Sequence, residues 1–240
     1  MGGKGIAQLE IILAFVIFVS SVMFALYFFN PAENTRAVDS SLIYAINEIE
    51  KEVNVKLESY DVKINKAVVP IENKAISIAL GDKIELEKVS RVESFKTGNV
   101  LNSEINYESG IIYFDWTKEE EDFINVYLSD DFSSSGAVLE KPDVNEQFYK
   151  ISSMNSRKLI SEKKARELKN SYDANYENLR KKLNLQRTEF GFVLSFSLGE
   201  NIEAKRDEQK EAEIFLKTLK KEILRTNGKR EFGNLKVTIW

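Results

Sequence analysis

The sequence predicts an α+β fold, in which an N-terminal transmembrane helix is followed by an antiparallel-sheet ectodomain with two C-terminal amphipathic helices. Three observations support this prediction. An uncharged apolar run covers residues 11–29 and is long enough for a membrane helix. Short β-rich runs separated by turn residues continue as far as residue 128. Two later segments, 156–183 and 203–225, repeat apolar residues at three- and four-residue spacing.

Composition excludes most enzyme chemistry. The 240 residues include no Cys and no His, which removes thiol nucleophiles, Ser-His-Asp triads, His-ligated zinc and disulfides. A hydrophobic content of 43% and a charged content of 30% are typical of a folded ectodomain. A net charge of -4 argues against nucleic-acid binding by the whole molecule. We therefore expect no catalysis, no cofactor, no metal site and no nucleic-acid partner.

The N-terminal apolar run predicts a single membrane crossing. Ile11 to Phe29 contains no charged residue, and as a helix this run spans about 28 Å, close to the roughly 30 Å hydrocarbon core. Lys4 and the amino terminus place the short N-terminal side in the cytoplasm and the C-terminal domain outside the cell. A cleaved secretory signal is the alternative, but the run exceeds its usual length and ends in Tyr27-Phe28-Phe29, without small residues.

Lys4-Gly5, followed by Ile6-Ala7-Gln8-Leu9-Glu10 and the apolar helix, resembles the processing site of type IV pilins, specifically the archaeal class III signal peptide. The resemblance implies that a prepilin peptidase removes the leader, residues 1–5, by cutting between Gly5 and Ile6 on the cytoplasmic side. Glu10 then stands at the fifth mature position, where the family has its glutamate. Many archaeal members carry Gln and then Ser or Thr where Ile6 and Gln8 stand here.

Glu10 lies at the entrance of the apolar run, although a carboxylate costs about 3 kcal/mol at a bilayer centre. Cutting before Ile6 creates an α-amino group about one helical turn from this carboxylate. The resemblance implies that Glu10 pairs with the amino terminus of a neighbouring subunit, which offsets part of the burial cost and sets the register of assembly. The alternative is that Glu10 lies among lipid headgroups and reaches water.

A second helix is predicted after the membrane run. Asn30-Pro31-Ala32-Glu33 supplies an N-cap, a proline at the first helical position and a glutamate at the third. Apolar residues at helical spacing then continue to about residue 57, namely Val38, Leu42, Ala45, Ile46, Ile49, Val53 and Leu57. The two helical halves, residues 6–57, resemble the long spine helix of pilins, whose second half packs on a sheet.

Residues 58–128 are predicted to form a β-rich domain. The expected strands contain Val62 to Val69, Ala75 to Leu80, Lys83 to Val89, Ile111 to Trp116 and Phe123 to Leu128. The loop composition of Ser133-Ser134-Ser135-Gly136, with Pro142 beyond it, makes 129–146 the predicted linker.

Residues 147–240 are predicted to form an α+β C-terminal domain. Its expected elements are a helix from 156 to 183, a strand from 190 to 198, a helix from 203 to 225 and a strand from 234 to 240. Residues 175–180, 190–192 and 232–240 are similar to C-terminal segments of archaeal membrane-anchored pilin-like proteins.

Charge is unevenly distributed along the chain. Residues 103–146 hold twelve acidic and two basic residues, including Glu119-Glu120-Glu121-Asp122 and Asp130-Asp131. Such a density could bind calcium, but the segment lacks the alternating ligands and central glycine of an EF-hand loop. No two carboxylates stand out as a glycosidase pair. We interpret the segment as a solvated charged surface.

Residues 157–187 have the opposite charge, with ten Lys and Arg against four acidic residues. Tyr172 and Tyr176 lie among them, and basic residues beside aromatics can hold single-stranded nucleic acid. Both tyrosines fall on an apolar stripe with Leu168 and Leu179, so we interpret them as core residues. The basic face of one subunit could also meet the acidic face of the next.

The sequence thus predicts a membrane-anchored, pilin-like protein, a minor subunit of an archaeal type IV pilus-like surface filament that acts in assembly or adhesion. Its expected partners are the membrane, a prepilin peptidase, other pilin-like subunits and a surface ligand. No Asn-x-Ser/Thr sequon is present, which favours a minor subunit over a glycosylated major one. The alternative is a stand-alone, single-pass surface binding module that uses the helix only as an anchor.

Overall fold

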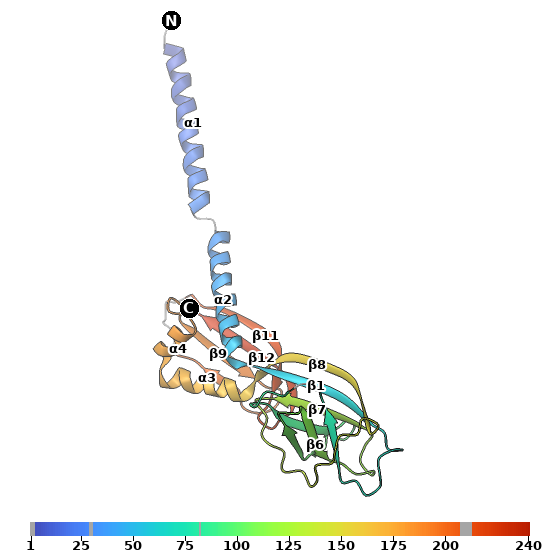
Figure 1. The fold of residues 1–240 in the computed structure, drawn as a ribbon. Helices are drawn as coiled ribbons and strands as arrows, with labels where there is room; N and C mark the ends of the chain where they lie inside the picture. The colour runs from blue at the N-terminus through green and yellow to red at the C-terminus, as the bar shows by residue number, and fades with distance from the viewer. Residues whose placement is uncertain (1–2, 29–30, 82, 207–212) are drawn as a thin grey trace. The chain divides into compact units, whose positions relative to one another are not determined.

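A computed structural model of the chain describes residues 3–28, 31–81, 83–206 and 213–240 (Figure 1). Within these ranges it describes the side chains of residues 12–25 and of those from 39 onward. The chain divides into two compact units, Met1–Tyr44 and Ala45–Trp240.

Two consecutive helices begin the described chain, α1 (Gly3–Phe28) and α2 (Pro31–Val53). Among the described residues no helix is both long and apolar enough to cross a membrane, so the predicted transmembrane spine helix is wrong. α2 ends at Val53 rather than at 57, because the residues from Asn54 onward pair as a strand.

The protein is mainly β, and the predicted α+β fold class is wrong. The described residues form twelve strands and four helices. The strands are β1 (Asn54–Ile64), β2 (Ala75–Ala79), β3 (Val89–Ser94), β4 (Val100–Leu101), β5 (Ser103–Asn106), β6 (Ile111–Asp115), β7 (Phe123–Ser129), β8 (Tyr149–Ser161), β9 (Phe190–Ser195), β10 (Ile202–Ala204), β11 (Phe215–Leu224) and β12 (Arg230–Ile239). Nine of them form one sheet in the order β10-β9-β12-β11-β8-β1-β7-β3-β4, and β2-β6-β5 form a second sheet. All pairs are antiparallel except β8 with β11, which pair in parallel over two residues each.

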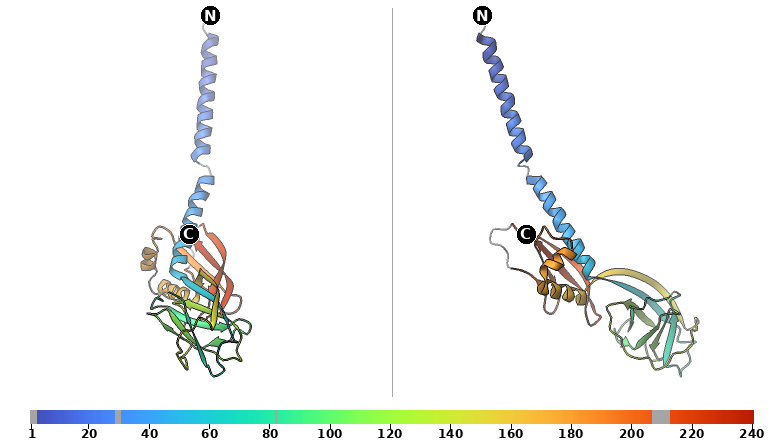
Figure 2. Two further views of the ribbon diagram at one scale, coloured as in Figure 1. Left: turned by 45° about the vertical axis from the view of Figure 1, so that its right-hand side comes forward. Right: turned by 60° about the vertical axis from the view of Figure 1, so that its left-hand side comes forward.

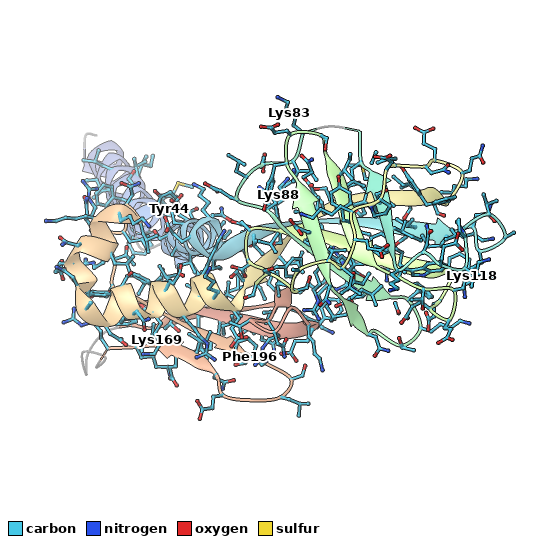
Figure 3. All side chains as sticks on the ribbon, turned by 60° about the horizontal axis from the view of Figure 1, so that its bottom comes forward. Tyr44, Lys83, Lys88, Lys118, Lys169 and Phe196 are labelled. Atoms are coloured by element: carbon cyan, nitrogen blue, oxygen red, sulfur yellow. The ribbon has the colours of Figure 1, made fainter. Side chains whose placement is uncertain are left out.

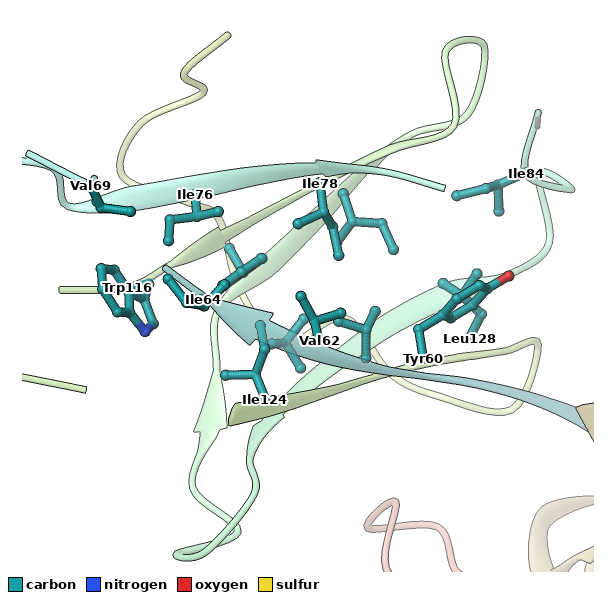
Figure 4. Close-up of a cluster of buried hydrophobic side chains, with 14 residues drawn as sticks. Tyr60, Val62, Ile64, Val69, Ile76, Ile78, Ile84, Trp116, Ile124 and Leu128 are labelled. Atoms are coloured by element: carbon teal, nitrogen blue, oxygen red, sulfur yellow. The ribbon is translucent and has the colours of Figure 1, made fainter. Parts of the chain in front are cut away.

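Strands β1 to β8 form a part of the protein that we call the sandwich. β1 pairs along its length with β8 and over its second half with β7. The three-stranded sheet contributes residues to the same apolar core as β1 and β7 (Figure 4). On β6, Ile112 and Phe114 are fully buried while Tyr113 between them is half-buried. Alternate side chains of a strand point to opposite faces of its sheet. The inward-facing side chains of both sheets therefore meet in one core.

Strands β9 to β12, with α3 (Glu162–Ala174) and α4 (Tyr176–Lys182), form a part that we call the covered sheet. The two helices lie on one face of these strands (Figures 1 and 2). Ser161 caps α3, since its side chain accepts a hydrogen bond from the Lys164 amide at 2.9 Å. Tyr172 then packs edge-on against Phe190 and Phe192 of β9, with ring centroids 5.4 Å and 6.5 Å away.

The predicted helix over 203–225 is wrong, although residues 207–212 lie outside the described residues. Residues 215–224 of this range form strand β11, and all ten of them pair with β12. Phe215, Leu219 and Ile223 are four residues apart and also two-residue alternates, so their spacing fits a helix and a strand equally well. Pairing with β12 selects the strand over the helix. The preference of a segment for a strand depends more on its pairing and burial than on its own residues.

The other predicted C-terminal helix, 156–183, begins later and is interrupted. Residues up to Ser161 belong to β8, and Asn175 separates α3 from α4 by accepting a hydrogen bond from the Asn178 amide at 3.1 Å. The predicted linker, residues 129–146, contains no helix or strand beyond the end of β7. β1 pairs both with β7, which precedes this segment in the sequence, and with β8, which follows it.

Candidate functional site

The residues predicted for processing and assembly lie in the first turns of α1. Lys4, Gly5, Ile6 and Glu10 have helical backbone there, but their side chains lie outside the described residues. The cut between Gly5 and Ile6, and the pairing of Glu10 with an amino terminus, therefore stay predictions.

α1 carries apolar side chains on all of its sides. Phe15, Val16, Ile17 and Phe18 are 66%, 53%, 58% and 65% exposed, and four consecutive residues at about 100° steps cover the whole circumference of a helix. Over residues 12–25, where the side chains of α1 are described, the other large exposed apolar residues are Ile12, Leu13, Val22, Met23 and Phe24. A helix that is apolar all round is normally buried, and a patch of this kind marks a site of interaction.

The acidic segment 103–146 holds loops together. Asp115 accepts hydrogen bonds from Asn102 Nδ2 at 3.0 Å and from the Leu139 amide at 2.9 Å. Glu121 accepts one from the Lys96 amide at 2.7 Å. Within the described ranges, no group of three or more Asp, Glu, His or Cys is placed to hold a metal ion. The contacts of Asp115 and Glu121 explain these two acidic residues without a ligand.

Tyr172 and Tyr176 are buried, which confirms their interpretation as core residues. The Tyr172 hydroxyl donates a hydrogen bond to the Phe190 carbonyl at 2.7 Å, and the Phe190 amide donates one to the Tyr176 hydroxyl at 2.9 Å. Burial raises the pKa of Tyr172 to about 12 and raises that of Tyr176 as well. Neither ring is available to stack on a base.

A buried carboxylate joins the start of α3 to the β11–β12 turn. Glu162 is 3% exposed and receives hydrogen bonds from Arg225 Nε at 2.7 Å, Arg166 Nη2 at 2.7 Å and the Thr226 amide at 3.1 Å. Burial alone would raise the pKa of Glu162, but these hydrogen bonds outweigh burial and lower it. A carboxylate so fully paired holds structure and has no free acid or base role.

A cavity of about 480 Å³ lies where β1 ends, and we call it the lysine pocket. Its charged lining consists of Lys63, Lys66, Lys150 and Asp122. The backbone carbonyl of Gln147 accepts a hydrogen bond from Asn65 Nδ2 at 3.4 Å, which joins two loops of the lining. The sequence did not indicate this site, because Lys63 and Lys150 meet only through the register of β1 with β8.

Two other cavities of the sandwich have the opposite charge. One, of about 410 Å³, is lined by Lys74 with Asp115 and Glu120. The other, of about 370 Å³, is lined by Lys141 with Glu104 and Glu108. Each lining thus carries one positive and two negative groups, whereas the lysine pocket carries three positive and one negative.

The described residues therefore present two surfaces that the fold does not explain, the apolar circumference of α1 and the lysine pocket. No protein-family model, curated protein or solved structure matches the chain.

Proposed function

We propose that the protein is a pilin-like subunit of a surface filament of the archaeal type IV pilus kind, and that copies assemble by packing their α1 helices together. The observation that carries this proposal is the exposure of large apolar side chains around the whole of α1. Burying such side chains yields about 1.5–3 kcal/mol each. α1 therefore favours an assembly over an isolated chain.

The distribution of the apolar residues favours copies of the same helix as the partner. A single partner with one docking face would cover one side of α1 and leave Phe15 or Ile17, on the other sides, in water. An array of like helices surrounds each α1 on all sides. The folded unit Ala45–Trp240 has its own buried core, so burial of α1 in such an array does not require this unit to rearrange.

The processing motif supports the same proposal. A prepilin peptidase that cuts between Gly5 and Ile6 would leave an amino terminus about one turn from Glu10. In a packed array, pairing between that amino group and the carboxylate of a neighbour would offset the cost of burying both charges. Glu10 would then set the stagger between neighbouring copies.

Cysteine crosslinking tests the assembly, because the chain has no Cys of its own. Leu13 and Phe15 point to opposite sides of α1, since two residues along a helix differ by about 200°. In the native host, oxidation of the double variant Leu13→Cys/Phe15→Cys should give a ladder of trimers and larger species. Each single variant should give dimers only. The matched control Glu87→Cys/Glu108→Cys, with both residues exposed on the sandwich, should give no ladder.

Two measurements on the same material sharpen the result. Mass spectrometry should show a chain that begins at Ile6, and Glu10→Ala should remove the ladder. A chain that begins at Met1 and crosslinks no further than dimers would contradict the proposal. It would favour a stand-alone surface module whose α1 is covered by lipid or by another protein.

A further inference from the structure

The lysine pocket contains two like charges that no carboxylate of the described residues neutralises. Lys63 of β1 and Lys150 of β8 are directly opposite each other in the antiparallel register, and like charges in that position destabilise a sheet. Among the described residues, neither lysine has an ion pair with a carboxylate. The described contact of Lys63 is with the Phe123 ring, whose centroid lies 5.5 Å from Nζ. The contact with the ring offsets part of the repulsion, but both positive charges remain without a negative partner.

A third lysine is held in place on the rim. Lys66 Nζ lies 2.9 Å from Asp122 Oδ1 and 5.9 Å from the centroid of the Trp116 ring. Asp122 is fixed in turn, because its backbone carbonyl accepts a hydrogen bond from the Ile64 amide at 2.7 Å. The four charged groups leave a net charge of +2 on the lining, from three lysines and one aspartate.

The loops that carry these groups are joined to each other by hydrogen bonds of the fold itself. The Asn65 amide donates a hydrogen bond to the Phe148 carbonyl at 2.8 Å, and the Val68 amide donates one to the Asn65 carbonyl at 3.0 Å. Tyr149, also in the lining, accepts a hydrogen bond at its hydroxyl from the Ala79 amide at 2.9 Å. A lining ordered in this way costs little conformational entropy on binding.

The surroundings favour a small anion over a long polyanion. Asp61 lies two residues before Lys63 on the same face of β1, and it accepts a hydrogen bond from the Ser153 hydroxyl. Glu121 directly precedes Asp122 of the lining in the sequence. Carboxylates close in sequence to the lining would repel a continuous phosphate backbone. The volume of about 480 Å³ lies within the range of small-molecule sites.

We propose that the lysine pocket binds the oxyanion of an acidic sugar, either a uronate carboxylate or a sugar sulfate. Lys63 and Lys150 would face the charge. The side-chain oxygen of Asn65, whose Nδ2 already donates to the Gln147 carbonyl, and the side-chain amide of Gln147 would pair with sugar hydroxyls. Lysine ammonium groups are compact point charges, so they suit a single carboxylate or sulfate group. Such a site would give an adhesive surface protein its ligand, yet binding does not depend on assembly through α1.

Calorimetric titration of the full chain tests this site with four probes at constant ionic strength: sodium glucuronate, glucose 6-sulfate, glucose and a single-stranded oligonucleotide. Glucuronate or glucose 6-sulfate should bind, and the stronger of the two identifies the source of the oxyanion. Glucose should not bind. The double variant Lys63→Met/Lys150→Met should weaken binding by about tenfold or more, the loss expected for charge-assisted hydrogen bonds.

The matched control is Lys83→Met/Lys169→Met, two lysines labelled in Figure 3 that do not line the pocket. It should bind like the parent. The double variant of the pocket should melt no lower than the parent, because it removes a repulsion, whereas a structural role for the two lysines predicts a loss of stability.

Three results would overturn the proposal. Binding of glucose as tight as that of glucuronate would show that charge plays no part. Equal losses in the pocket variant and the control would show a diffuse surface effect. Tighter binding of a single-stranded oligonucleotide than of either acidic sugar would show that the pocket belongs to a nucleic-acid surface. None of these results depends on whether α1 assembles.

Discussion

The sandwich and the covered sheet belong to the same folded unit but are held together in different ways. The core of the sandwich consists of apolar side chains, with Ile112, Phe114 and Trp116 all at most 1% exposed. Both parts also have polar contacts between elements distant in sequence, such as Lys88 with Glu58 in the sandwich at 2.9 Å. In the covered sheet, such contacts attach a helix, α3, to the strands. Glu162 reaches Arg225, and Tyr172 reaches the Phe190 carbonyl.

Apolar packing and buried polar contacts contribute differently to the fold. Apolar packing supplies most of the free energy of folding but tolerates exchange among residues of similar volume. A buried hydrogen bond contributes less, but it requires one donor and one acceptor in one geometry. The polar contacts therefore fix where α3 lies on its sheet, and the apolar contacts make the sandwich stable.

The largest expected effect belongs to the core of the sandwich. Phe114 is 0% exposed and pairs with Ile76 of β2 and with Ser103 of β5. Phe114→Ala removes a ring from a closely packed core and should lower the free energy of unfolding by about 3–5 kcal/mol. Urea unfolding followed by circular dichroism measures this loss.

A control for Phe114→Ala is Phe123→Ala, because Phe123 is 47% exposed and its loss should cost much less. If Phe114→Ala does not fold, Phe114→Leu should still unfold at lower urea than the parent. Equal costs at Phe114 and Phe123 would mean that the apolar core does not dominate the stability of the sandwich.

The two parts also differ in how far their sequences predicted their structure. In the sandwich, the expected strands at 75–80, 111–116 and 123–128 match β2, β6 and β7 closely, because alternation and turn residues bound them. The expected strand from Lys83 to Val89 is wrong, and β3 begins only at Val89. There the alternating residues Ile84 and Leu86 do not share a buried face, since Leu86 is 80% exposed.

In the covered sheet, pattern alone was not sufficient. The spacing within β11 fitted a helix as well as a strand, and the choice depended on β12, which the local sequence does not contain. The lysine pocket was not predicted for the same reason, because Lys63 and Lys150 are brought together by the register of two strands. α1 was predicted as a helix from its composition, but a membrane crossing was not borne out.

The next largest effect is expected at the anchor of α3. Glu162→Gln keeps the shape of the side chain but removes the charge that Arg225 and Arg166 bind. We expect a loss of about 1.5–3 kcal/mol in the free energy of unfolding at pH 7, the range for hydrogen bonds to a charged group. Glu167→Gln, an exposed position on the same helix, is the matched control and should change stability little.

The pH dependence of stability identifies the charge as the cause. The folded-state pKa of Glu162 is lowered, so its contribution is complete above the unfolded-state pKa of about 4.3 and is lost as the pH falls through the folded-state pKa. The difference between the parent and Glu162→Gln should therefore shrink below about pH 4. A difference that stays constant down to pH 2 would mean that Glu162 acts by shape, like a residue of the sandwich core.

The smallest effect on stability is expected at Tyr172, where the substitution removes a single hydroxyl group. Tyr172→Phe leaves the ring in place but removes the hydrogen bond to the Phe190 carbonyl, which still receives one from the Tyr176 hydroxyl at 3.3 Å. We expect a loss of about 1 kcal/mol in the free energy of unfolding. Tyr44→Phe, at an exposed tyrosine, should cost nothing measurable.

Alkali provides a second measurement on the same variant. Burial raises the pKa of Tyr172 to about 12 in the folded state, above the value of about 10 expected in the unfolded chain. The folded state then holds its proton more tightly, so the stability of the parent should fall as the pH rises from about 10 to 12. Tyr172→Phe should fall less steeply over that range. A variant that loses as much as Phe114→Ala at neutral pH would mean that the hydroxyl supports packing across the whole covered sheet, and the distinction between its two kinds of contact would not hold.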